Sequence, residues 1–195
     1  MIIHDVQQGT PEWFELRLGI PTASRFKDIF TSTGKPAAGA DGYMYSLLAE
    51  LVAGKPLESF ESEWMRRGTE LEPDARAFYE LQKDADIQQV GFITNDDKTI
   101  GCSPDGMGLE IKCPAPHTHM KYLLAGKCPS EYYPQVQGTM WLCEYESWDF
   151  MSYHPDLPPL IVTVKRDDKY IDGLEEAITK FLDKMAKKQQ LLEVA

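Results

Sequence analysis

The sequence predicts an α/β domain in which a mixed central β-sheet is flanked by α-helices. Helical patterns fill most of the first 81 residues, short segments rich in β-branched and aromatic residues follow, and an amphipathic helix closes the chain. Strands placed between helical segments favour a layered α/β arrangement. A length of 195 residues fits one domain, 1–195, built around one core.

The first third of the chain carries helix-start and helix-stop signals. Thr10 and Pro11 are a helix cap and a first helical residue, and that helix should end at Gly19. Thr22 is expected to cap a second helix over 23–30, before a loop at 31–42 that is rich in Gly and Pro. Further helices are predicted at 43–53, ended by Gly54, and at 62–81.

The middle and the end of the chain supply the strands. Segments 87–94, 98–104 and 107–114 have strand composition, and only residues 106–108 need lie between the last two. These two are therefore expected to pair as a hairpin. Helices at 117–125 and 130–142, strands at 147–154 and 160–166, and a helix at 169–192 complete the prediction.

The net charge of −11 constrains the class of function. Because DNA phosphates attract cations, this charge taken alone favours a soluble enzyme with no nucleic-acid partner. A nuclease remains compatible if a metal neutralises its carboxylates and its basic residues line one channel. No apolar run reaches 18 residues, so no membrane span is expected. The N-terminus turns polar too early for a signal peptide, so a cytoplasmic protein is expected.

The cysteines carry no CxxC pair, which zinc ribbons and most cluster sites need. They are expected to be reduced and mostly buried, with no metal bound. A zinc site is conceivable along a C-x3-H-x-H-x8-C string, although its spacing fits no common pattern. The residues of that string are Cys113, His117, His119 and Cys128.

The stretch that carries chemistry is 103–112. Asp105 ends one predicted strand, and Glu110 and Lys112 lie two residues apart on the next, which places them on one face. Leu109 and Ile111 then face the core. The predicted hairpin brings Asp105 opposite Glu110.

These residue types suit metal-assisted hydrolysis of a phosphodiester. Two close carboxylates repel each other, and a divalent metal between them removes that cost. Oxygen ligands suit Mg²⁺, and a neighbouring lysine can orient water or stabilise charge on phosphoryl oxygens. The competing interpretation is an exposed hairpin with a Pro-Asp-Gly turn and a solvated Glu-Lys face.

Longer blocks of sequence resemble a known family. They are WFELRLGIPTAS (13–24), LLAELVAG (47–54), RGTELEPDARAFYE (67–80), CSPDG (102–106), GLEIKCP (108–114), YYPQVQGTMW (132–141) and RDDKYID (166–172). In order and spacing they resemble the alkaline exonucleases of the phage lambda exonuclease type, which are YqaJ-like viral recombinases of the PD-(D/E)xK nuclease superfamily. The resemblance implies a restriction-endonuclease-like core. Some members of the superfamily carry an iron–sulfur cluster, usually with a close CxxC element, and because this chain has no CxxC no cluster is expected.

The resemblance also implies roles for the catalytic residues. Asp105 and Glu110 would bind two Mg²⁺ ions per active site, with Mn²⁺ able to substitute, and the backbone carbonyl of Ile111 would complete one site. Lys112 would act on the attacking water. Glu72 would support the metal site. A capping box formed by Thr69 and Glu72 at a helix start is the alternative for the last residue.

Three further residues match the family's substrate contacts. Arg17 and Ser24 would bind the terminal 5′ phosphate, which suits a guanidinium and a hydroxyl. Gln135 would lie on the active-site helix near Tyr132. The alternatives are a surface ion pair for Arg17, support of a helix start for Ser24, and exposed helix surface for Gln135. Trp13 is expected in the core.

The activity that the resemblance implies is processive 5′→3′ degradation of linear double-stranded DNA. Mononucleotides would be released, and a 3′ single-stranded tail would remain for a single-strand annealing protein. The family implies a ring-shaped homotrimer around the duplex. Two alternatives stay open. One is an endonuclease or junction nuclease of the same superfamily, and the other is a catalytically silent module that binds DNA ends or recruits a recombinase.

Overall fold

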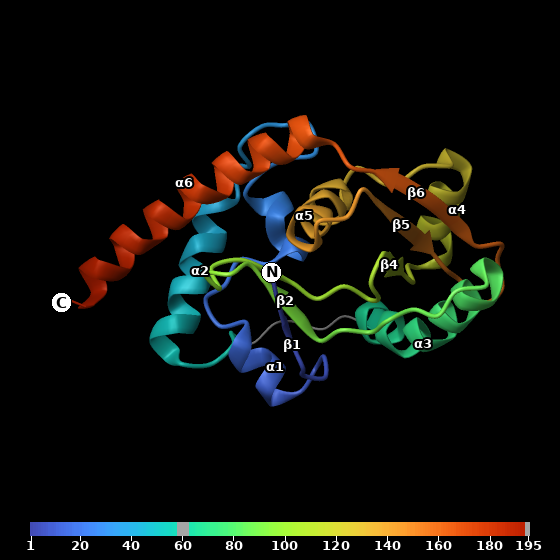
Figure 1. The fold of residues 1–195 in the computed structure, drawn as a ribbon, viewed down its shortest axis with the longest axis horizontal. Helices are drawn as coiled ribbons and strands as arrows, with labels where there is room; N and C mark the ends of the chain where they lie inside the picture. Colours follow the sequence, from blue (N-terminus) through green and yellow to red (C-terminus); the bar gives the residue numbers. More distant parts are fainter. Residues whose placement is uncertain (58–62, 194–195) are drawn as a thin grey trace.

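Two three-stranded sheets flanked by helices make up the computed structural model, which describes residues 1–57 and 63–193 (Figure 1). The helices are α1 (Pro11–Leu16), the 3-10 helix η1 (Ala23–Asp28), α2 (Ala40–Ala53), α3 (Glu63–Lys83), α4 (Pro116–Ala125), α5 (Tyr133–Cys143) and α6 (Asp168–Glu193). The strands are β1 (Ile2–His4), β2 (Phe92–Thr94), β3 (Gly101–Cys102), β4 (Leu109–Lys112), β5 (Ser147–Ser152) and β6 (Leu160–Lys165).

The predicted α/β class is confirmed, and the helices lie close to their predicted positions. Thr10 accepts a hydrogen bond from the Trp13 N–H at the start of α1, and Gly54 ends α2 in the left-handed conformation. The predicted start of the fourth helix at residue 62 lies outside the described residues. None of the helices within the described ranges combines the length and the apolar character needed to cross a bilayer.

Strand pairing differs from the prediction in one important respect. The predicted hairpin of β3 and β4 is wrong, because β3 pairs with β2 and β4 pairs in parallel with β5. Antiparallel β6 completes the β4–β5–β6 sheet, so this sheet is mixed, while β1–β2–β3 is antiparallel throughout. β3 contains only two residues, whereas β5 offers β4 a partner along its whole length. The expected single sheet is therefore divided in two.

Thr22 was expected to cap a helix, and this is also wrong. Its backbone is extended, its side chain makes no capping hydrogen bond, and the segment that follows is a 3-10 helix. Thr22 instead bridges Gly101 in parallel and donates its N–H to the Tyr43 hydroxyl at 3.1 Å. Pairing with β3 thus overrides its local capping preference.

The β4–β5–β6 sheet is covered on both faces. Leu109 and Ile111 of β4 pack with Ala75 and Tyr79 of α3 in one apolar cluster. The opposite face meets the larger core, where α5 packs on both sheets and on η1. Gly138 makes the contact with η1 possible, because a Cβ there would lie 2.3 Å from a ring carbon of Phe26.

Most of the cysteines, and the histidine His119, lie buried in the structure. All four cysteines are free thiols, and three are buried. His119 is fully buried, and its two ring nitrogens contact the Ser152 hydroxyl at 2.8 Å and the Pro158 carbonyl at 2.9 Å. Both ring nitrogens are therefore occupied by hydrogen bonds in the packed region between α4 and β5.

A buried carboxylate joins α3 to the same sheet. Asp149 of β5 accepts hydrogen bonds from the Tyr79 hydroxyl at 2.8 Å and the Thr163 hydroxyl at 2.6 Å, and it pairs with Lys83 at 2.9 Å. Burial alone would raise the pKa of Asp149, but the hydrogen bonds from Thr163, Lys83 and Tyr79 outweigh burial and lower it. The ionised form of Asp149 therefore stabilises the fold.

We expect Asp149→Ala to lower the free energy of unfolding by about 1–3 kcal/mol at neutral pH, since the Tyr79 and Thr163 hydroxyls lose their shared acceptor while the exposed Lys83 returns to water. The lowered pKa means that this contribution is present above the unfolded-state pKa of about 3.9 and is lost as the pH falls through the folded value. Urea denaturation over a pH series measures it. The difference in free energy of unfolding between wild type and Asp149→Ala should decrease as the pH falls. The exposed Asp86→Ala should differ little from wild type at any pH. A difference that does not change with pH would contradict a stabilising role for the ionised Asp149.

Candidate active site

Six of the predicted site residues line one pocket of about 200 Å³. α1, η1, β4, α5 and the segment after β3 form its walls. The seventh predicted side chain, Glu72, lines a neighbouring hollow that shares Asp105 with this pocket. The six are Arg17, Ser24, Asp105, Glu110, Lys112 and Gln135.

β4 presents Glu110 and Lys112 on the pocket face, as its period-two alternation predicted. The Lys112 ammonium donates a hydrogen bond to Glu110 Oε1, and Gln135 Nε2 donates to the same oxygen at 2.5 Å. Glu110 is only 1% exposed, so the solvated-hairpin interpretation does not describe this strand. The Gln135 contact likewise replaces the interpretation of that residue as exposed helix surface.

Asp105 reaches β4 although β3 and β4 do not form a hairpin. Its Oδ2 accepts the N–H of Ile111 at 2.6 Å, directly between Glu110 and Lys112 in sequence. A tight turn makes this possible, with Gly106 bridged to Leu109 and Gly108 at φ +87°. The left-handed conformation at residue 108 explains the need for glycine there.

The electrostatics of the pocket favour a bound cation. Burial raises the pKa of Glu110 to about 7 despite the nearby Lys112 ammonium, and the Asp105 carboxylate adds to this shift. Burial also raises the pKa of Asp105, against Lys112 and the Ile111 N–H. Burial disfavours the charged form of Lys112, but Glu110 and Asp105 outweigh it and raise the pKa. One ammonium thus faces two buried carboxylates, and a divalent cation would offset the remaining repulsion.

These donors fit a hard cation that keeps some of its ligands as water or substrate. Within residues 1–57 and 63–193, no three His, Cys, Asp or Glu side chains converge as metal ligands. A cation at Asp105 and Glu110 would therefore take its remaining ligands from backbone carbonyls, water or phosphate oxygens. This combination is typical of Mg²⁺.

Glu72 lies within α3 rather than at a helix start. α3 begins at Glu63, so the capping-box interpretation of Thr69 and Glu72 is wrong. Arg76, four residues on, donates from Nη2 to Glu72 Oε1 at 2.5 Å and from Nε to the Asp105 carbonyl at 3.0 Å. Burial, then the Asp105 carboxylate, raises the pKa of Glu72. Arg76 is therefore the link between Glu72 and Asp105.

Arg17 and Ser24 form a separate wall of the pocket. The Arg17 guanidinium lies 4.0 Å from the centre of the Trp13 ring and donates to the Ser103 hydroxyl at 2.9 Å. Trp13 Nε1 donates to the same hydroxyl at 3.0 Å. Burial lowers the pKa of Arg17 to about 10, so the guanidinium stays charged at neutral pH. Among the described residues it makes no ion pair, and its charge is therefore available to an anion.

Sequence reasoning missed several residues of this site. Ser103 holds Arg17, and Trp13, expected in the core, is half-buried in the pocket wall. Tyr132 was not missed, since the resemblance implies its place near Gln135, and its ring lies 5.3 Å from Lys112 Nζ. Only Arg76 carried a local signal, since Glu72 and Arg76 have the i, i+4 spacing of a helical ion pair.

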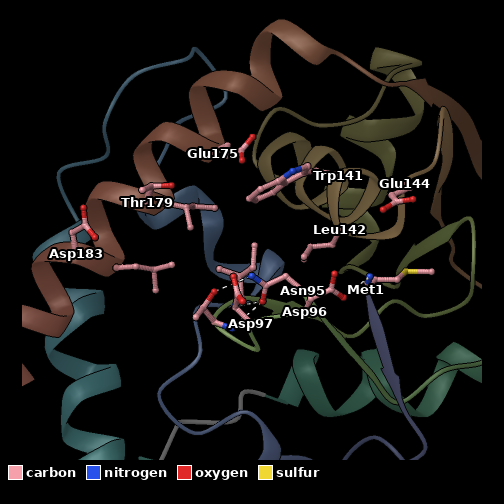
Figure 2. A pocket seen from close by; sticks show the side chains of 14 residues that line it. Met1, Asn95, Asp96, Asp97, Trp141, Leu142, Glu144, Glu175, Thr179 and Asp183 are labelled. Carbon is pink, nitrogen blue, oxygen red and sulfur yellow. Dashed lines mark hydrogen bonds and ion pairs between the residues drawn. The ribbon is translucent and has the colours of Figure 1, made fainter.

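A larger hollow of about 510 Å³ lies elsewhere, between the 95–99 turn, α5 and α6 (Figure 2). It contains none of the predicted site residues. Its lining includes several carboxylates, among them Asp96, Glu144 and Glu175. Their negative charge repels phosphate, which makes this hollow unsuited to the chemistry of the pocket.

A mixed α/β core thus carries a pocket in which acidic, basic and hydroxyl side chains meet. Residues 12–146, more than half of the chain, match the model of the YqaJ-like viral recombinase domain. The chain therefore belongs to that family.

Solved structures and a curated relative agree with this assignment. The alkaline exonuclease LHK-Exo from Laribacter hongkongensis is similar with a TM-score of 0.86 and 34% identity, over 94% of this chain and 96% of that one. Its complex with dAMP is similar with a TM-score of 0.85, at the same identity and coverage. The putative uncharacterized protein ExoD of Escherichia coli (strain K12) is 32% identical over 71 residues, 34% of this chain and 82% of that protein, and its description adds similarity without a characterised activity.

A more distant structure shares the fold alone. The phage related exonuclease from Haemophilus somnus 129PT is 19% identical, with a TM-score of 0.65 over 89% of this chain and 95% of that one. Family membership and the likeness to LHK-Exo assign this chain a nuclease role of the exonuclease kind.

We expect Ser103→Ala to lower the free energy of unfolding by about 1 kcal/mol, because Arg17 loses its hydrogen-bond acceptor while the Trp13 indole keeps the Gly91 carbonyl at 3.0 Å. Urea denaturation measures the effect. Thr179→Ala, which removes an exposed hydroxyl on α6, should change stability by no more than about 0.5 kcal/mol. Equal effects of the two substitutions would show that Ser103 does not hold the pair.

Proposed function

We propose that this chain is a processive 5′→3′ exonuclease on linear double-stranded DNA, formed as a single nuclease domain over 1–195. It would release 5′-mononucleotides and leave a 3′ single-stranded tail for annealing-type recombination. One observation carries the proposal. A single small pocket contains both a carboxylate pair with a lysine and a separate arginine with hydroxyls, so bond cleavage and recognition of a terminal phosphate can occur side by side.

The Arg17 side of the pocket supports end-dependence. The Arg17 guanidinium and the hydroxyls of Ser24 and Ser103 would bind a 5′ phosphate, which offers the bidentate geometry that arginine prefers. Fixing the terminal phosphate there would place the next phosphodiester at Asp105 and Glu110, so each cut would remove one nucleotide. The dAMP complex of the Laribacter enzyme supports a mononucleotide product.

The carboxylate side of the pocket would hold the metal. Asp105, Glu110 and the Ile111 carbonyl would bind two Mg²⁺ ions, which Mn²⁺ could replace, and Glu72 would support them from α3. When bound, such ions lower the pKa of water and offset charge on the phosphate. The raised pKa values of Asp105 and Glu110 support this, because burial disfavours both charged carboxylates and a bound cation would favour them.

The chain's own groups would do the rest of the work. The Lys112 ammonium would orient the attacking water and donate to a non-bridging phosphate oxygen as charge develops there. Gln135 would hold Glu110 Oε1 in place through the 2.5 Å hydrogen bond. The Tyr132 ring, 5.3 Å from Lys112 Nζ, would keep that ammonium over the site.

Assembly and partners follow from kinship rather than from the pocket. We propose a ring-shaped homotrimer that encloses the duplex and passes the 3′ tail to a single-strand annealing protein. Enclosure would give processivity without high affinity for DNA. An exterior with the chain's net charge of −11 would also repel other DNA, so the substrate would be held only inside the ring.

We expect Lys112→Ala to slow the digestion of 5′-phosphorylated linear duplex by about 10²–10³-fold in Mg²⁺, because one charge-stabilising donor is lost. Release of acid-soluble nucleotide measures the rate, and EDTA should abolish it. The exposed Lys187→Ala is the control. Covalently closed DNA should survive the wild type. Its cleavage would favour the endonuclease alternative, and no turnover of linear duplex would favour a silent end-binding module.

Arg17→Ala should reduce the preference for 5′-phosphorylated over 5′-hydroxyl ends by about 10- to 100-fold, the equivalent of one charged hydrogen-bonding contact. Initial rates on the two duplexes provide the ratio. Arg17→Lys keeps the charge and should lose only part of the preference, because lysine cannot bind phosphate as a fork. A ratio equal to that of wild type in Arg17→Ala would exclude this residue as the end sensor.

A further inference from the structure

A further hollow, of about 740 Å³, lies at the start of α5. The segment that follows η1, the segment just before α5 and the first turns of α6 line it. Figure 1 shows the light-blue segment after η1 running beside the start of α6. There the Tyr170 hydroxyl donates to the Thr31 carbonyl at 3.1 Å.

The charge of this hollow is opposite to that of the chain. Lys127 and Lys169 line it, are exposed, and make no ion pair within residues 1–57 and 63–193. The acidic side chain in its wall is Asp167, whose carboxylate accepts the Tyr133 hydroxyl at 2.9 Å and the Tyr170 N–H at 3.0 Å. Two free ammonium groups therefore face one carboxylate that is already hydrogen-bonded.

The other hollows differ in this respect. The one in Figure 2 is lined by the side chains of Asp96, Asp97, Glu144, Glu175 and Asp183, and its cationic group is the amino terminus. In the hollow beside Glu72, the Arg76 guanidinium is bound to that carboxylate. Outside the catalytic pocket, the hollow at Lys127 and Lys169 is therefore better suited to an anion than these two hollows, in a chain of net charge −11.

Packed aromatic side chains line this hollow. Phe30 and Tyr170 have ring centres 5.4 Å apart, and Tyr133 and Tyr170 have theirs 4.9 Å apart. Ser32 and Ser130 add hydroxyl donors at the wall. Ammonium groups and hydroxyls over an apolar floor suit a sugar–phosphate backbone, whose phosphates accept hydrogen bonds and whose sugars present apolar faces.

The position of the hollow connects it to the catalytic pocket. Tyr133 lines the hollow, and the neighbouring Tyr132 contacts Lys112, so adjacent residues serve the two sites. η1 does the same, with Ser24 in the wall of the pocket and Phe30 just beyond its end in the hollow. A DNA strand that leaves the catalytic pocket over α5 or η1 would meet Lys127 and Lys169.

We propose that this hollow binds phosphodiester groups of the substrate DNA outside the catalytic pocket, through Lys127 and Lys169. The inference rests on the proposed function, because it takes DNA as the substrate. The contact at Lys127 and Lys169 contributes to the affinity for DNA and to the salt dependence of binding, and it takes no part in bond cleavage. A net-acidic nuclease would in this way hold its substrate through a local cationic site.

The test measures equilibrium binding without turnover. Lys127→Ala/Lys169→Ala is introduced into the Lys112→Ala protein, and binding of a fluorescently labelled linear duplex is followed by anisotropy from 50 to 300 mM salt in Ca²⁺. The slope of log K against log[salt] should become shallower by about 1–2, the loss of one or two phosphate contacts. Lys180→Ala/Lys187→Ala is the matched control, about 16 and 27 Å from Lys169 along the same helix.

Activity assays complete the test. In the otherwise wild-type protein, Lys127→Ala/Lys169→Ala should raise KM for long linear duplex and leave kcat at saturating DNA unchanged. A salt slope that equals that of the control pair overturns the proposal. So does an unchanged slope with weaker inhibition by dAMP, which would assign the hollow to free nucleotide. Binding is measured without cleavage, so a protein that binds duplex but never cuts it contradicts the proposed function and leaves this inference standing.

Discussion

The arrangement of one ammonium against two buried carboxylates is the constraint that the surrounding structure satisfies. Burial disfavours the ionised forms of Asp105 and Glu110 and raises both of their pKa values, whereas the Lys112 ammonium favours the ionised forms. β4 holds the three groups together because both of its faces are covered. Leu109 and Ile111 pack on α3, and Glu110 meets Gln135 of α5. The packing of one face of β4 against α3 therefore holds the mutually repelling Asp105 and Glu110 carboxylates close together at the other face.

α5 brings the two halves of the site together. It packs on both sheets and on η1, and Gly138 allows its close approach to Phe26. Gln135 from its first turns reaches Glu110, while η1 supplies Ser24 and α1 supplies Arg17 to the same pocket. The pocket is consequently a product of helix packing, although its carboxylates lie on a strand and a turn.

Local sequence patterns were sufficient to predict part of this site, but they could not predict the residues that long-range contacts bring to it. The alternation of Leu109, Glu110, Ile111 and Lys112 depends only on strand geometry, so it was predictable, as was the end of α2 at Gly54. The partner of β4 depends on β5, some 40 residues away in sequence, and nearest-neighbour reasoning produced a false hairpin. Thr22 failed for a similar reason, because its bridge to Gly101 is a long-range contact. Trp13 and Ser103 join the site through hydrogen bonds across about 90 residues, which no periodicity encodes.

The position of Ser103 has a consequence for the proposed stepwise cleavage. Ser103 anchors Arg17 and Asp105 belongs to the carboxylate pair, so a single residue, Pro104, separates the proposed phosphate-binding group from the proposed metal-binding group along the chain. The segment 103–105 spans at most about 7 Å and cannot stretch. Pro104 stiffens it further by fixing a backbone dihedral. This short covalent connection would make the length of each cleavage step insensitive to movements of the surrounding helices. Cuts of irregular length would then arise from the position of the DNA end rather than from the protein.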